Sequence, residues 1–122
     1  KSVERVVFCS GKVYYELLEE RRKNEQFNVA IIRIEQLYPF PEKELQAALA
    51  DYQHVKQFVW CQEEPQNQGA WYCSQHHFRA AIPEGTYLTY AGRDASAAPA
   101  VGYMSLHVKE QQALVTQALT LD

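Results

Sequence analysis

The sequence predicts an α/β domain with a mainly parallel sheet and helices on both of its faces. Three observations support this fold class. Stretches typical of strands alternate four times with stretches typical of helices along the 122 residues. The strand-like stretches are short and largely apolar, as expected for strands that are buried on both faces. This alternation gives four β–α units in series, and such units form parallel sheets with right-handed crossovers.

The expected strands are runs of apolar, β-branched and aromatic residues, which pack well on a pleated sheet. The first run ends at a Ser-Gly-Lys turn, the second at a stiff segment with two prolines, and the third at two adjacent carboxylates. The fourth is followed by a long loop of small residues, 92–102. In chain order, the four strands are expected at residues 6–9, 29–34, 55–61 and 87–91.

The expected helices carry apolar residues at the spacing of one helical face. The first begins after the Ser-Gly-Lys turn and ends before an Asn-Glu-Gln break. Pro41 suits the first position of the second helix, and Pro83 with Gly85 ends the third. In chain order, the helices are expected at about residues 13–23, 42–51, 69–81 and 105–119.

The composition is that of an ordinary globular domain, with 47% hydrophobic and 22% charged residues. The net charge of -3 gives no basic patch for nucleic acid or for an anionic membrane. No apolar stretch approaches the roughly 18 residues that span a bilayer. Three widely spaced cysteines, Cys9, Cys61 and Cys73, argue against a disulfide framework and fit a reducing compartment. The first residue is not methionine, so a fragment cut at a domain boundary is expected.

The loops after the four strands should meet at the carboxyl edge of the sheet, where open α/β sheets bind ligands. Ser10 and Lys12, with Gly11 between them, can hold an anion through a helix N-terminus and an ammonium group. The alternative is that Ser10 simply caps the helix. One glycine is too few for a P-loop or a dinucleotide fingerprint. Arg93 is either a forked donor to a phosphate-bearing ligand or a solvated arginine in a connector.

Glu63 and Glu64 stand side by side at the end of the third strand. In extended backbone their side chains point to opposite faces, so a catalytic carboxylate pair is not expected. One of them can bind a loop N–H or a neighbouring arginine while the other faces solvent. We therefore expect an interface or structural role for the loop, and for its residues Asn67 and Trp71.

No metal site is expected, and no nucleophile–base pair is apparent. His76 and His77 are consecutive, so on a helix they project about 100° apart. Metal-binding pairs stand four residues apart, and no cysteine completes a zinc pattern. His54 and His107 are expected to be surface or packing residues. The 12% aromatic residues either fill the core or form a surface for another domain or subunit.

Five segments of the chain carry a resemblance to a known family. Residues 33–41 read RIEQLYPFP, and residues 62–71 read QEEPQNQGAW. Both segments resemble characteristic phrases of the 2-oxoglutarate dehydrogenase family, in its thiamine-diphosphate-dependent first component. Three more blocks of the family are matched in its order, at residues 9–15, 92–100 and 107–112. The chain thus resembles the C-terminal domain of this family over nearly its whole length.

The resemblance implies one transketolase-type C-terminal domain over residues 1–122, with a fifth, antiparallel strand besides the four expected from the pattern. It implies that thiamine diphosphate and magnesium bind outside this domain, since the Gly-Asp-Gly and Asn-Asn motif is absent. No catalytic or cofactor-binding residue is therefore assigned to this chain, which is expected to be inactive alone.

The resemblance also implies a homodimeric parent enzyme that decarboxylates 2-oxoglutarate and passes the succinyl group to a lipoyl group of dihydrolipoyl succinyltransferase. The compartment would be the bacterial cytoplasm, or the mitochondrial matrix in a eukaryote. A nucleotide or acyl-CoA effector would give Ser10, Lys12 and Arg93 a role. The alternative is a stand-alone α/β module that binds a nucleotide or coenzyme A.

Overall fold

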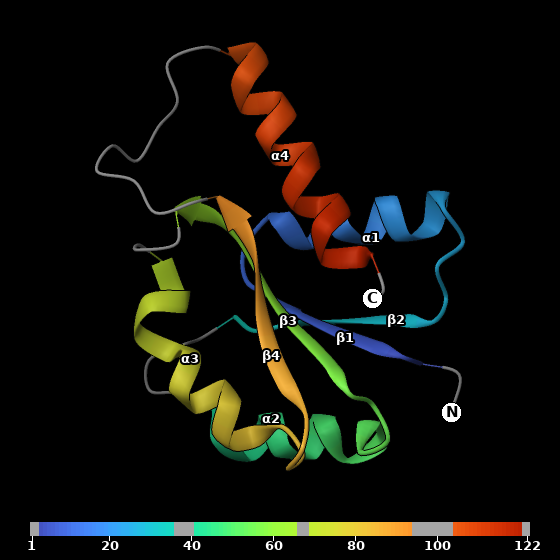
Figure 1. Cartoon of the computed structure of the whole chain (residues 1–122), viewed down its shortest axis with the longest axis vertical. Coiled ribbons are helices and arrows are strands. Elements are labelled where there is room, and N and C mark those ends of the chain that lie inside the picture. The colour runs from blue at the N-terminus through green and yellow to red at the C-terminus, as the bar shows by residue number, and fades with distance from the viewer. Residues whose placement is uncertain (1–2, 36–40, 66–68, 94–103, 121–122) are drawn as a thin grey trace.

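One parallel sheet of four strands lies between two layers of helices (Figure 1). The computed structural model describes residues 3–35, 41–65, 69–93 and 104–120. The strand order is β2-β1-β3-β4, and all three strand pairs are parallel. The strands are β1 (Arg5–Cys9), β2 (Val29–Arg33), β3 (Gln57–Pro65) and β4 (Tyr87–Arg93).

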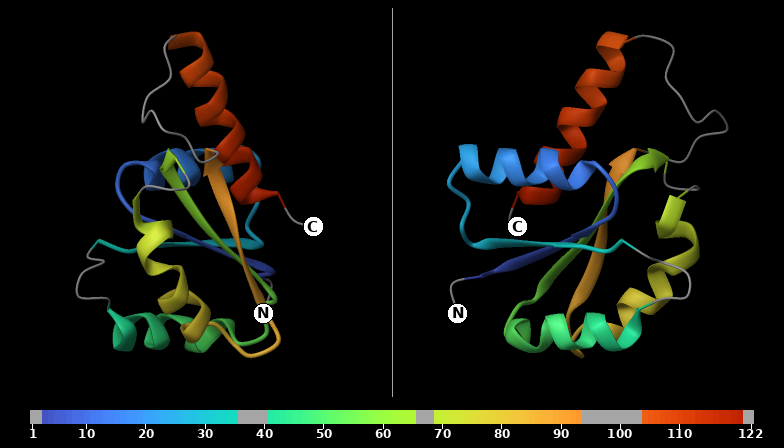
Figure 2. Two further views of the ribbon diagram at one scale, coloured as in Figure 1. Left: turned by 60° about the vertical axis from the view of Figure 1, so that its left-hand side comes forward. Right: turned by 180° about the vertical axis from the view of Figure 1, so that it is seen from behind.

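The helices divide between the two faces of the sheet, as the views from two further directions show (Figure 2). Helices α1 (Val13–Lys23) and α4 (Met104–Leu119) cover one face. Helix α2 (Glu42–Ala48), the 3₁₀ helix η1 (Leu49–Tyr52) and helix α3 (Gly69–Ala81) cover the other. Such a layered arrangement buries both faces of a parallel sheet, which explains its largely apolar strands.

Two hydrophobic cores result from the alternation of side chains along each strand. On the α2–α3 face, the ring of Phe8 lies 5.0 Å from Phe78 and 6.0 Å from Phe58, measured between centroids. On the α1–α4 face, Val7 and Cys9 pack with residues of both helices. Strand β1 therefore contributes side chains to both cores.

The first strand and the last helix are tied together by hydrogen bonds. Arg5 is buried, and its Nε donates to the carbonyl oxygen of Ala118 at 2.7 Å. The side chain of Gln26 donates to the carbonyl oxygen of Leu119 at 2.9 Å. These donors satisfy carbonyl groups that the last turn of a helix leaves without partners, and the cation favours that end of the helix dipole.

The structure confirms the predicted fold class, and it corrects several boundaries. The second helix was expected to run to residue 51, but it tightens into the 3₁₀ helix η1 from Leu49 onward, as helix ends often do. Strand β3 begins two residues later than expected and continues through Glu63 and Glu64 to Pro65. Among the described residues there are four strands and no antiparallel pair, so the fifth strand stays an expectation.

Strand β4 also runs two residues further than predicted, because Gly92 allows a close approach of the chain. A Cβ at this position would lie 2.5 Å from the hydroxyl oxygen of Tyr90 and 2.9 Å from the carbonyl oxygen of Gln62. Any other residue would collide with the backbone of β3 here. The glycine was expected to open a loop, and instead it continues the sheet.

Candidate functional site

The strand order places a change of winding direction at the carboxyl ends of β1 and β3. The chain moves from β1 outward to β2, and later returns to the other side of β1 to form β3. Doubly wound sheets bind their ligands where the winding changes direction in this way. Two segments that the sequence singled out lie at this point. Ser10-Gly11-Lys12 follows β1, and Glu63-Glu64-Pro65 forms the end of β3.

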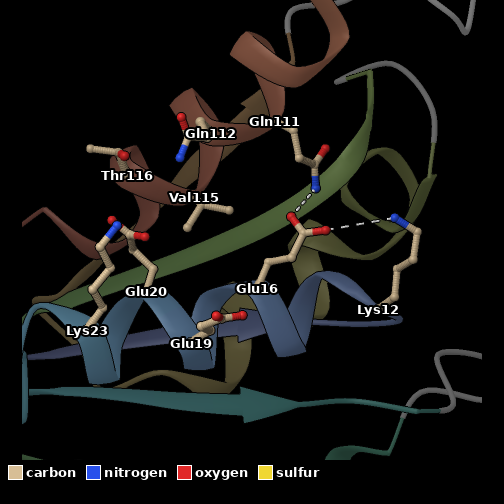
Figure 3. A pocket seen from close by; sticks show the side chains of 9 residues that line it. All are labelled: Lys12, Glu16, Glu19, Glu20, Lys23, Gln111, Gln112, Val115 and Thr116. Carbon is tan, nitrogen blue, oxygen red and sulfur yellow. Dashed lines mark hydrogen bonds and ion pairs between the residues drawn. The ribbon is translucent and has the colours of Figure 1, made fainter. Parts of the chain in front are cut away.

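An ion pair joins these two segments. The Nζ atom of Lys12 lies 2.9 Å from Oε1 of Glu63 and 4.0 Å from Oε2 of Glu16. Glu16 in turn accepts a hydrogen bond of 2.7 Å from the side chain of Gln111 on α4 (Figure 3). The network links the start of α1, the end of β3 and α4, and the ammonium group of Lys12 faces two carboxylates.

The structure does not place Ser10 at the N-cap of helix α1. That position is held by Lys12, with φ -73° and ψ -14°, and no side chain caps the helix there. Gly11 has φ +80°, which confirms the expected turn and explains the glycine, since other residues adopt this conformation at a cost. Because the turn takes up both residues 11 and 12, the helix begins too late for the Ser10 hydroxyl to cap it.

Gln62 is the residue that organises the end of β3, although the sequence pointed to the two glutamates beside it. It is buried, and its Oε1 accepts hydrogen bonds from the Trp60 indole at 2.8 Å and from the Trp71 backbone N–H at 3.0 Å. Its Nε2 donates to the carbonyl oxygen of Glu64 at 3.1 Å. One amide thus joins strand β3 to the first turn of helix α3.

The two glutamates have different surroundings. Glu63 turns toward Lys12 on the α1 face, whereas Glu64 is exposed. The prediction that they belong to a loop was wrong, because both lie within β3. The cation that Glu63 contacts is Lys12, whereas the sequence led us to expect a loop N–H or a neighbouring arginine as the partner.

Trp71 belongs to the core and not to an open surface. It is 7% exposed, and its ring lies 5.3 Å from that of Tyr90 and 5.6 Å below the guanidinium carbon of Arg79. Its backbone N–H is one of the two bonds to Gln62. Trp71, in the first turn of α3, therefore packs in the core on the α2–α3 face of the sheet.

The remaining candidates of the carboxyl edge are placed only in part. Arg93 is the last residue of β4, in register with Pro65 of β3. Since β3 lies between β1 and β4, Arg93 is two strands away from β1, the strand that leads into Ser10. The side chain of Arg93 and the whole of Asn67 lie outside the described residues.

A second surface, which the sequence did not single out, lies along the outer edge of β2. The guanidinium carbon of Arg33 is 5.2 Å from the ring centroid of Tyr14 and 5.0 Å from that of Tyr15. A hydrogen bond of 3.0 Å to the Tyr15 hydroxyl raises the pKa of Arg33 above its ordinary value, and Glu35 lies 2.6 Å from its Nε. Tyr15 is 58% exposed.

Beside this cluster, a largely apolar groove of about 330 Å³ separates β2 from helix α2. The residues that line it come from the end of β2 and from one face of α2; they are Ile32, Arg33, Ile34, Glu35, Pro41, Glu44, Leu45 and Ala48. An apolar strand that lies at the edge of a sheet leaves apolar atoms exposed, but the sequence pattern of β2 does not distinguish an edge strand from an interior one.

The described residues include histidines, cysteines and carboxylates, which are the side chains that bind metal ions. They contain no group of three potential metal-ligating side chains. His77 contacts Glu42 at 3.4 Å, and His76 stacks on His77, but no third ligand joins them. Burial raises the pKa of the Cys9 thiol to about 12 and also raises that of Cys61, so neither is a ready thiolate ligand.

A long groove of about 440 Å³ runs between helices α1 and α4 (Figure 3). Lys12 and Lys23 stand at its two ends, and Glu16, Glu19 and Glu20 lie between them on α1. The α4 side is formed by Gln111, Gln112, Val115 and Thr116.

None of the helices in the described part of the chain has the length and apolar character that a membrane-spanning helix needs.

The fold and the site define a parallel α/β domain that has, in its described part, no set of metal ligands. The family described as 2-oxoglutarate dehydrogenase C-terminal matches residues 1–119. The chain therefore belongs to this family of 2-oxoglutarate dehydrogenase C-terminal domains.

Proteins named 2-oxoglutarate dehydrogenase E1 component are similar to nearly the whole chain. It is 68% identical to the 2-oxoglutarate dehydrogenase E1 component of Haemophilus influenzae over 120 residues, which are 98% of this chain. It is 57% identical to the protein of that name from Azotobacter vinelandii over 99% of the chain, and 54% identical to that from Coxiella burnetii over 99%. The chain spans only 13% of the length of each of these relatives.

Proposed function

We propose that this chain is the C-terminal packing domain of a 2-oxoglutarate dehydrogenase first component, and that the chemistry takes place elsewhere in the parent protein. The family match and the 13% coverage support this proposal. The cofactors, thiamine diphosphate and magnesium, would bind in other domains of the parent protein. The alternative of a stand-alone module gains no support, because the chain aligns with a small part of much longer proteins.

The main structural support for this proposal comes from the outer edge of strand β2. An exposed, apolar edge strand is an association hazard unless something covers it. Residues 30–33 of β2 are all half-buried, and no lysine or proline protects the strand. The adjacent groove is mostly apolar, and arginine and tyrosine, the residues stacked at its end, are enriched in protein contacts. Another part of the parent protein covers this edge, and the fifth strand expected from the family would complete the sheet there.

Hydrogen exchange tests this role of β2 directly. In the isolated chain, the outward amides of the edge strand β2 should exchange quickly, while those of the central strand β1 are protected. In the complete parent protein, β2 should gain protection and β1 should change little. An exchange pattern of β2 that is the same in both proteins would contradict the proposal.

Two exposed tyrosines provide a matched pair of variants for the same surface. Tyr15 beside β2 is 58% exposed, and Tyr87 at the start of β4 is 54% exposed. If the β2 side is a contact surface, Tyr15→Ala should destabilise the parent by about 1 kcal/mol more than the isolated chain. Tyr87→Ala should have the same effect in both. If denaturant titrations give the same difference in destabilisation between parent and isolated chain for both variants, the β2 side is not a contact surface.

For the parent protein we propose decarboxylation of 2-oxoglutarate and succinyl transfer to the lipoyl group of dihydrolipoyl succinyltransferase, as a homodimer in the bacterial cytoplasm. The names and bacterial sources of the relatives support this assignment. The isolated chain should show no decarboxylation of 2-oxoglutarate with thiamine diphosphate and magnesium, and the parent should. Turnover of 2-oxoglutarate by the isolated chain would overturn the proposal that the chemistry takes place elsewhere in the parent protein.

The carboxyl edge of the sheet at Ser10, Lys12 and Arg93 remains a proposed site for a nucleotide or acyl-CoA effector. Its position at the change of winding direction favours a ligand there. An anion would have to compete with Glu63, which lies 2.9 Å from the Lys12 ammonium. Calorimetry of the parent protein with AMP and with acetyl-CoA should therefore give tighter binding in Glu63→Gln and weaker binding in Lys12→Ala. No heat with either compound would exclude both as effectors.

A further inference from the structure

We draw no further inference here: the strongest candidate, the groove between α1 and α4 lined by three glutamates and two lysines (Figure 3), has nearly balanced charge, and nothing in the structure shows what covers it.

Discussion

Replacing Gln62 by leucine should destabilise the domain strongly, although the residue has no charge and lies next to two glutamates that do. Leucine keeps the approximate size of the side chain and removes both of its hydrogen-bonding atoms. The Trp60 indole N–H and the Trp71 backbone N–H then lose their acceptor inside the protein. Water cannot replace it easily, because Gln62 is 2% exposed.

The expected loss follows from these two donors. A buried donor left without a partner costs about 1–3 kcal/mol, so two cost about 2–6 kcal/mol. The buried methyl groups of leucine offset about 1 kcal/mol of this. A net loss of about 1–5 kcal/mol is a substantial share of a total stability of about 5–15 kcal/mol. At about 4 °C for each kcal/mol, the melting temperature should fall by about 4–20 °C.

Chemical denaturation of the isolated chain, followed by tryptophan fluorescence, measures this loss. The protein has two tryptophans, and both are bonded to Gln62, so the signal reports on the site itself. Gln112→Leu on the exposed face of α4 is the control, and it should change the stability by less than about 0.5 kcal/mol. If Gln62→Leu behaves like this control, Gln62 does not hold the end of β3 as described.

Three further predictions concern other parts of the fold. In a double-mutant cycle, Lys12→Ala and Glu63→Ala should be coupled by only about 0.2–1 kcal/mol, because Lys12 is largely exposed, and the coupling should fade in about 1 M salt. Gly92→Ala should cost about 1–3 kcal/mol in thermal unfolding, since its Cβ would meet a carbonyl oxygen at 2.9 Å; an unchanged melting temperature would refute the steric argument. The raised pKa values of Cys9 and Cys61 favour the neutral thiols in the folded state, so their contribution to stability is complete below about pH 9 and is lost as the pH rises toward 12. Unfolding at pH 7 and pH 10 should show this loss in the natural chain and less of it in the variant with alanine at both positions.

The sequence was sufficient for the architecture and insufficient for the details of the carboxyl edge. The strands and helices follow from local patterns of apolar residues, and the structure confirms them to within a few residues. The role of Gln62 could not be read in this way, because its partners include a backbone N–H nine residues further along the chain. The expected cap at Ser10 failed because the turn at Gly11 moves the start of the helix, which composition alone does not reveal.

The β2 surface was missed for a different reason. Its apolar run resembles that of an interior strand, and strand order cannot be read from one sequence. Only the pairing of β2 with β1 alone, among the described strands, shows that the run lies at an edge. The stack of Arg33 on two tyrosines likewise joins residues 18 and 19 positions apart, which belong to different elements.

The bond between Arg5 and the carbonyl group of Ala118 spans 113 positions of the chain. During synthesis, β1 leaves the ribosome long before the carbonyl groups that its arginine needs exist. The same holds for the α1–α4 face of the sheet, whose core includes Leu114 and Leu119. This domain is therefore expected to complete its folding late, with high contact order and slow kinetics, and to depend until then on protection of its first strand.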